Sequence, residues 1–172
     1  MRVVISDSSV LIDLAKVKLI ERTLALPYEF VIPDVIFEDE LIDLKHYERE
    51  QLLELGFKTG SLTGEQVGIV SQYSRNYKPL TINDCFALVL AESIERSILL
   101  TGDGDLRKTA QKHKVETHGI IWLCEQIRES QRGDDKILLT ALEILRDDPR
   151  SRIPSRELNR LIEQLKIESM LE

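Results

Sequence analysis

Acidic residues recur at separate points of the sequence, each beside an apolar run. They are Asp7 after VVIS, Glu38, Asp39 and Glu40 after IPDVIF, Asp84 in TINDCFALVLA, and Asp103 with Asp105 after ILLTG. Carboxylates rarely enter apolar surroundings unless a positive charge awaits them there. Converging carboxylates repel one another and raise their own pKa values, whereas Mg²⁺ or Mn²⁺ neutralises them and prefers oxygen ligands. The pattern therefore indicates a metal site that could activate water.

The elements that would position these acids follow from the spacing of apolar residues. Short apolar runs predict strands at 3–6, 30–32, 97–101 and 115–118. Helical spacing predicts helices at 10–19, 34–55, 65–77, 81–95, 103–114 and 120–129, with a loop at 56–64. This alternation is typical of an α/β fold with a mainly parallel sheet, right-handed crossovers and helices on both faces.

The acids fall where such a fold builds ligand sites. Asp7 follows the first strand and Asp103 the third, and ligands bind at the carboxyl ends of parallel strands. Each acid also has an ordinary explanation. Asp7 and Asp103 are favoured N-cap residues, Asp105 would lie in a first helical turn, and Asp84 could complete a capping box with Thr81. The joint arrangement is a stronger signal than any single residue.

Helical spacing distinguishes among the acids at 38–40. Within a helix over 34–55, Glu40 shares its face with Leu44 and Tyr47. Glu38 and Asp39 share their faces with charged and polar residues, so both are expected to meet solvent. Glu40 is therefore the predicted site residue, although a kinked or frayed helix would leave all three exposed.

These residues and their order resemble the PIN-domain nuclease family, including its VapC-like toxin ribonucleases. The matching motifs are Asp7-Ser8 after the first strand, Glu40 on an early helix, Asp84 in NDCFALVLA, and TGDGDL at 101–106. The resemblance covers roughly residues 1 to 129. It implies a three-layer α/β/α fold with a sheet of four or five strands, and Mg²⁺- or Mn²⁺-dependent cleavage of RNA. It also implies a possible antitoxin partner and a homodimer.

The resemblance also assigns roles to residues. Asp7, Glu40, Asp84 and Asp103 would hold one or two metals, and Asp105 would be a further ligand or a base. Three polar residues would support them, with Ser8 and Thr101 orienting water or phosphate oxygens and Asn83 adding a contact beside Asp84. The competing hypothesis is a non-catalytic PIN-like module that keeps the acidic cup without turnover.

A composition shift at 130–135 predicts a C-terminal extension. The expected division is a nuclease domain at 1–132 and a helical extension at 133–172, with helices at 137–145 and 158–165 and Ser155 as a cap. The extension would cover the core or a dimer face. It also carries the clustered cations, so phosphate contact is the alternative. These are Arg146, Arg150, Arg152, Arg156 and Arg160.

Composition limits the remaining possibilities. At 172 residues and 42% hydrophobic content, the chain can form one well-packed domain with a short appended element. The net charge of −7 argues against nucleic-acid binding by charge alone. Cys85 and Cys124 lie in apolar helical patterns and are expected to be free thiols. No membrane span or secretory signal is visible, so a cytoplasmic location is expected.

Overall fold

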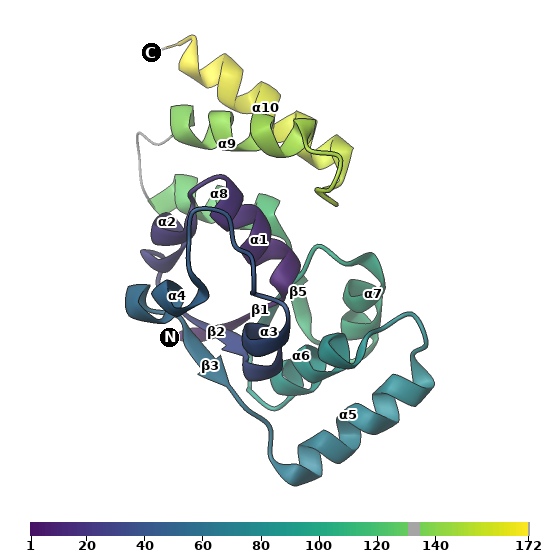
Figure 1. Ribbon diagram of the computed structural model, residues 1–172. Coiled ribbons are helices and arrows are strands. Elements are labelled where there is room, and N and C mark those ends of the chain that lie inside the picture. The colour runs from purple at the N-terminus through teal and green to yellow at the C-terminus, as the bar shows by residue number, and fades with distance from the viewer. Residues whose placement is uncertain (131–134, 172) are drawn as a thin grey trace.

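The computed structural model describes residues 1–130 and 135–171. In these residues, parallel strands form one five-stranded sheet in the order β3-β2-β1-β4-β5 (Figure 1). The strands are β1 Arg2–Ser6, β2 Tyr28–Pro33, β3 Lys58–Gly60, β4 Ile98–Leu100 and β5 Glu116–His118. The predicted α/β class and the parallel sheet are confirmed, and β1 lies at the centre of the sheet.

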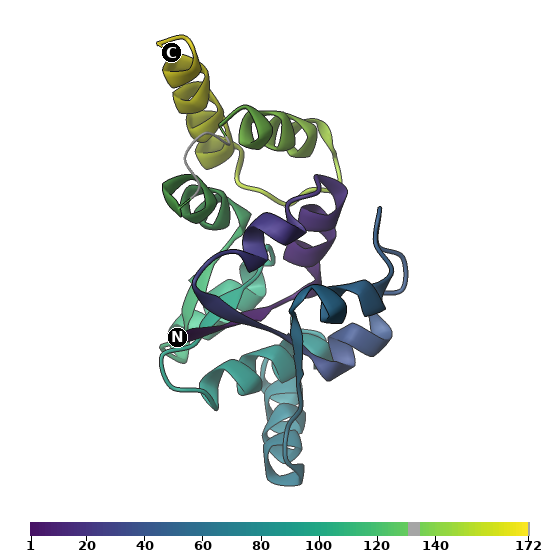
Figure 2. The same ribbon diagram turned by 90° about the vertical axis from the view of Figure 1, so that its left-hand side faces the viewer.

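Helices cover both faces of the sheet, as Figures 1 and 2 show. One face carries α1 Ser8–Lys16, α2 Ile20–Leu24 and α8 Ile120–Ser130. The other carries α3 Asp34–Asp39 and α6 Ile82–Glu92, with α5 Gly64–Asn76 packed against α6. At the sides lie α4 Arg49–Leu55 and, next to β5, α7 Gly104–Lys112. This arrangement is the three-layer α/β/α fold that was predicted.

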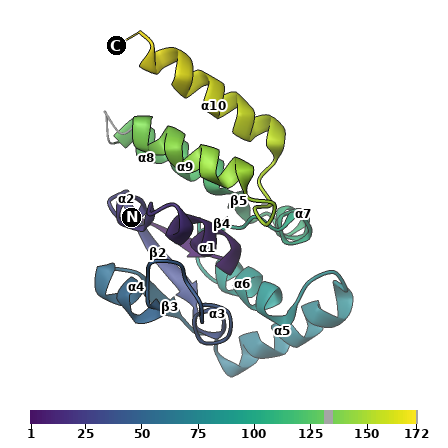
Figure 3. The same cartoon turned by 45° about the horizontal axis from the view of Figure 1, so that its top comes forward.

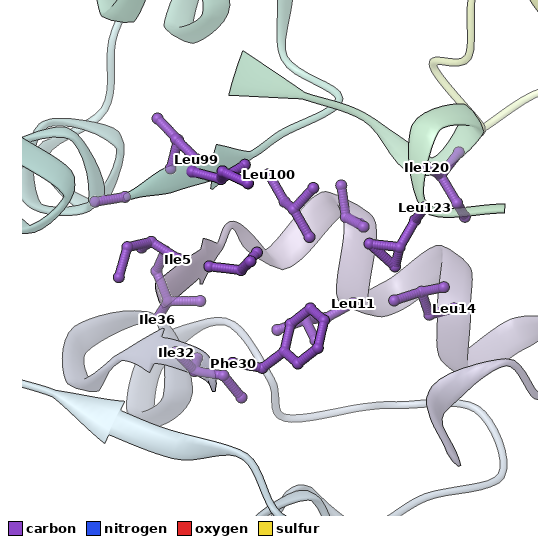
Figure 4. Close-up of a cluster of buried hydrophobic side chains, with 14 of the residues drawn as sticks. Ile5, Leu11, Leu14, Phe30, Ile32, Ile36, Leu99, Leu100, Ile120 and Leu123 are labelled. Carbon is purple, nitrogen blue, oxygen red and sulfur yellow. The ribbon is translucent and has the colours of Figure 1, made fainter. Parts of the chain in front are cut away.

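The core holds the central strand rigidly. Ile5 of β1 is fully buried, and Figure 4 shows it between the ends of its neighbour strands, with Leu11 of α1 beside Phe30 of β2. Strands covered on both faces read as continuous apolar runs, which explains the pattern at 3–6. The backbone N–H of Asp7 extends the pairing of β1 with β4 by donating to the Leu100 carbonyl at 2.9 Å. The first residue beyond β1 therefore has a fixed position.

The predicted continuous helix over 34–55 is wrong. The chain forms α3, leaves the helix at Glu40, and begins α4 at Arg49. The Arg49 guanidinium donates to the carbonyls of Phe37 at 3.2 Å and Glu38 at 3.0 Å, and so satisfies the end of α3. Between the helices Leu41 is buried in the core. Tertiary packing thus overrides the helical pattern.

The segment predicted as a loop at 56–64 contains β3. This strand has only three residues and no apolar alternation, and it forms by pairing with β2, Ile32 opposite Thr59. A Cβ added at Gly60 would lie 2.8 Å from both Val31 Cγ1 and Leu90 Cδ2. Glycine is therefore required where β3 approaches β2 and α6.

Two other local predictions need correction. The predicted helix at 10–19 ends too late, since α1 ends at Lys16 and Lys18 adopts a left-handed conformation. A second short helix, α2, which was not predicted, begins at Ile20. At the last helix, Pro154 occupies the N-cap position and Ser155 makes no cap. Proline disfavours a helical conformation in the residue before it, so the helix begins only after Pro154.

The C-terminal extension forms α9 Asp135–Asp147 and α10 Ser155–Ser169, stacked over α8 (Figure 3). Leu142 of α9 and Leu165 of α10 belong to the same buried apolar cluster as the sheet residues. Most of the composition shift at 130–135, and the predicted boundary at 132, lie outside the described residues, so that division stays a prediction. Cys85 and Cys124 are buried free thiols, as predicted. Within 1–130 and 135–171, no helix is long and apolar enough to cross a membrane.

Candidate functional site

Asp7 is the most buried acid of the site. It caps α1 directly after β1, and its side chain is 4% exposed. Its carboxylate accepts hydrogen bonds from the Ser8 backbone N–H at 2.8 Å, Thr101 Oγ1 at 2.9 Å and Ser9 Oγ at 3.1 Å. Burial raises the pKa of Asp7 to about 6, opposed by the hydrogen bonds and reinforced by the nearby charges of Asp84 and Glu40. The charged form of Asp7 is therefore less favourable than that of an exposed aspartate.

The end of β4 supplies the second part of the site. Thr101 is fully buried, and its Oγ1 also accepts from the Asp103 backbone N–H at 3.0 Å. Asp103 caps α7, with Oδ1 accepting from the N–H groups of Asp105 and Leu106, both at 2.9 Å. Oδ2 is the oxygen that remains for a partner outside the helix. Local helix-capping chemistry therefore fixes the direction of Asp103.

Asp84 comes from the start of α6. It completes the capping box that its spacing suggested, with Oδ2 accepting from the Thr81 N–H at 2.7 Å. Burial raises the pKa of Asp84, Thr81 lowers it, and the charge of Asp103 raises it further. The structural and the functional interpretations of Asp84 are therefore compatible, because one carboxylate both caps the helix and faces the other acids.

Glu40 lies at the rim, immediately beyond α3. Ser8 Oγ donates to its Oε1 at 3.3 Å, and Asn83 Nδ2 donates to its Oε2 at 3.4 Å. Burial is the largest cause of its raised pKa. The residue chosen from the acidic trio does face the other acids, but the argument for it was wrong, since no helical stripe through Leu44 and Tyr47 exists. Glu38 forms an ion pair with Arg49 at 3.5 Å and does not face the other acids.

One cavity of about 1190 Å³ joins these residues. Asp7, Glu40, Asp84 and Asp103 all line it, together with Ser8. Thr101 lies behind it, and Asn83 reaches it through Glu40. Asp105 is exposed on the first turn of α7 and does not line the cavity, so its predicted role has no geometric support.

Comparison with known families addresses the identity of this chain. A family model described as DUF3368, PIN domain, matches residues 3–167. The chain belongs to the PIN-domain family. The match extends well beyond the limit at about residue 129 that the motifs indicated, and it includes α9 and most of α10. No curated protein and no solved structure matches the chain.

The acids of this PIN domain have the donor chemistry for a hard divalent cation, because carboxylate oxygens gather around one cavity and nearby negative charge raises the pKa values of Asp7 and Asp84. Their present orientations do not yet form a ligand set. Within the described residues, no group of three or more His, Cys, Asp and Glu side chains is arranged to hold a metal ion. The hydrogen bonds explain this, since Asp84 Oδ2 faces Thr81 and Asp103 Oδ1 faces its own helix. The side chains of Asp84 and Asp103 would have to rotate before these oxygens could bind a metal ion.

Three further residues of the PIN domain contact the ends of β1 and β4 or the acids there. Ser9 Oγ donates to Asp7 and accepts from the Gly102 N–H at 3.0 Å, which joins the ends of β1 and β4. Arg107 Nη2 donates to the Thr101 carbonyl at 2.9 Å. Arg152 Nη1 lies 3.4 Å from Asp103 Oδ2. The place of Ser9 beside Asp7 is visible in the sequence, and Arg152 belongs to the cations noted in the extension, but the contact of Arg152 with Asp103 and the whole role of Arg107 depend on long-range packing.

Proposed function

We propose that this PIN domain is a metal-dependent ribonuclease that hydrolyses phosphodiester bonds of RNA. The observation that supports it is the convergence of Asp7, Glu40, Asp84 and Asp103 on one cavity. These acids come from four separated segments. The charge of Asp84 raises the pKa values of Asp7 and Glu40, and the charge of Asp103 raises that of Asp84, in addition to the larger effect of burial. A fold gains no stability from such repulsion, so the cluster is best explained by a bound cation. The nuclease-type fold of the family agrees with this function.

The cation would be Mg²⁺ or Mn²⁺, held by Asp7, Asp84, Asp103 and Glu40. When bound, it would polarise a phosphate oxygen and lower the pKa of a water molecule. The chain's own residues hold the carboxylates in place. Ser9 and Thr101 restrain Asp7 Oδ2, and Ser8 reaches from the same turn to Glu40. The cation would compete with these donors for Asp7 Oδ2.

A more specific proposal is a toxin of a toxin–antitoxin pair, acting in the cytoplasm as a homodimer and silenced by an antitoxin protein. Its support is the family resemblance alone. Tightly controlled expression of the chain should arrest growth, and co-expression of the neighbouring reading frame should relieve the arrest. Normal growth during expression of active nuclease would rule the toxin out.

One observation favours a non-catalytic module instead. Arg152 lies against Asp103 Oδ2, the oxygen that would meet the cation. A guanidinium in that position could balance the acidic cup without any metal. This pair is exposed on the Arg152 side, at 75% of the side chain, and such pairs contribute about 0–1 kcal/mol. The pair is therefore too weak to exclude a divalent cation, and the nuclease remains the better proposal.

The test is cleavage of a short single-stranded RNA by purified protein with Mn²⁺, Mg²⁺ or EDTA. We expect cleavage with the metals, none in EDTA, and a loss of at least about a hundredfold in Asp7→Asn and Asp84→Asn. Asp147→Asn is the matched control, because Asp147 is exposed and pairs only with the neighbouring Arg146 at 3.0 Å. Equal activity in all four proteins would mean that a contaminant cleaves the RNA.

A further inference from the structure

The connection between α9 and α10 is attached to the helix that begins at Asp7. Lys16 of α1 forms an ion pair with Asp148, with the two side chains only 13% and 12% exposed. Ser151 Oγ donates to Asp13 Oδ1 at 3.3 Å, also on α1. Figure 3 shows this connection reaching from the end of α9 toward the sheet side near β5 and α7. Two contacts thus fix a C-terminal segment beside the acidic cavity.

Arginine side chains project from this anchored segment. Arg150 and Arg152 are 83% and 75% exposed, so neither is required to fill the core. Arg160, two turns into α10, is also exposed. All three line the cavity that holds Asp7 and Asp84. The cavity therefore has an acidic end at the strand termini and a wall of three arginines and one acid, Glu157, supplied by the extension.

The two charge types suit different parts of an RNA strand. Carboxylates with a cation act on one phosphate, and they repel the phosphates on either side of it. Guanidinium groups match phosphate oxygens in a planar, bidentate geometry. The chain has 23 Lys and Arg against 30 Asp and Glu, and exposed arginines are common on protein surfaces. What distinguishes these three is that they line the same cavity as the acidic cluster.

We propose that Arg150, Arg152 and Arg160 form a phosphate-binding wall that holds the RNA strand beside the cleaved bond. This inference rests on the proposed ribonuclease function, and it assigns the C-terminal extension to the substrate site. The pairing of Arg152 with Asp103 is weak and exposed, so a phosphate can replace Asp103 at little cost once a cation neutralises that carboxylate. The wall contacts backbone phosphates and carries no base preference.

The test measures binding of a fluorescein-labelled 12-nucleotide single-stranded RNA by fluorescence anisotropy, with Ca²⁺ in place of Mg²⁺. The unaltered chain is compared with Arg150→Gln, Arg152→Gln and Arg160→Gln. Arg156→Gln is the matched control, because Arg156 is an exposed arginine of α10 that does not line the cavity. We expect each wall variant to weaken binding about fivefold. Each should also reduce the slope of log K against log salt by about 0.7.

Several outcomes overturn the wall. Equal RNA affinity in the wall variants and Arg156→Gln would do so, as would no measurable binding by the unaltered chain. Tighter binding by Arg152→Gln would mean that this arginine blocks the cup. Stronger binding of poly-glutamate than of RNA would assign the wall to an acidic protein segment.

Cleavage by the unaltered chain with Mn²⁺ is measured separately on the same RNA. No cleavage together with arginine-dependent binding would refute the nuclease and support the wall. Cleavage together with equal binding by all arginine variants would support the nuclease and refute the wall. The two proposals can therefore fail independently.

Discussion

Thr101 donates its hydroxyl hydrogen to Asp7 Oδ2 at 2.9 Å, across the ends of β4 and β1. The same hydroxyl oxygen accepts from the Asp103 N–H at 3.0 Å. One fully buried side chain therefore connects two acids that lie far apart in the sequence. This hydrogen bond stabilises the charged form of Asp7 and lowers its pKa, against the larger effect of burial.

Thr101→Val keeps the shape of the side chain and removes both hydrogen bonds. We expect the pKa of Asp7 to rise above its value of about 6, and the free energy of unfolding to fall by about 1–3 kcal/mol because buried groups lose their partner. NMR titration of the carboxyl carbon and urea unfolding measure the two effects. Thr109→Val is the control, since Thr109 is buried but donates to the Asp105 carbonyl. A similar Asp7 pKa in both variants would contradict the prediction.

The raised pKa of Asp7 makes the metal-free protein pH-dependent. Its pKa rises from 3.8 to about 6 on folding, so the folded state holds a proton that the unfolded state has released. Stability therefore falls as the pH rises from about 4 to about 6, by about 3 kcal/mol from this group. Glu40 and Asp84 also have raised pKa values and act in the same direction. The pKa of Asp148 is lowered to about 2, mainly by its hydrogen bond with Lys16, so this residue changes the stability only at lower pH.

Urea unfolding in EDTA at a series of pH values measures this loss. Repeating it with Mn²⁺ should restore stability mainly above pH 6, where Asp7 is ionised and can bind the cation. A metal-free stability that stays constant or rises between pH 4 and pH 6 would refute the assignment of strain to Asp7. A stabilisation by Mn²⁺ that is equal at pH 4 and pH 7 would refute metal binding at these carboxylates.

Gly60 and Gly68 should respond oppositely to alanine. A Cβ at Gly60 would lie 2.8 Å from Val31 and Leu90, so Gly60→Ala must displace β3 and should cost about 1–3 kcal/mol. A Cβ at Gly68, within α5, meets nothing within 4 Å, and Gly68→Ala should stabilise the helix by about 0.5–1 kcal/mol. Thermal unfolding of both variants gives the comparison. Destabilisation of equal size in both would contradict the close packing of β3.

Lys16→Gln tests the attachment of the extension. The Lys16–Asp148 pair is largely shielded from solvent, so its loss should lower the free energy of unfolding and leave Asp148 with only its longer, 3.5 Å pairing to the exposed Arg150. Hydrogen exchange of α10 should become faster. Lys58→Gln is the control, because Lys58 and Glu29 form an exposed pair at 2.8 Å and its loss should cost less than about 1 kcal/mol. Unchanged exchange in α10 would show that the extension is held by its apolar contacts alone.

The sequence alone determined the parts that depend on neighbouring residues. Strands and most helices follow from short-range apolar spacing, and Asp7, Asp84 and Asp103 stand where local capping rules place them. Both features are local in origin, because capping and strand length involve only a few consecutive residues. The pairing of β1 with β4, which the tertiary structure supplies, brings Asp7 and Asp103 together at the carboxyl ends of these strands.

Tertiary structure decided the rest. Arg49 ends α3 and leaves Glu40 at the rim, and β3 forms by pairing with β2. Arg152 reaches Asp103 from a segment that is attached to α1 through Lys16 and Asp148. Each of these features depends on a contact between residues that are far apart in the sequence, and neither residue type indicates which partner it will meet. The positions of Asp7, Asp84 and Asp103 were therefore predictable from local rules. The place of Glu40 and the cationic half of the cavity required tertiary contacts, including the packing of α9 and α10 over α8.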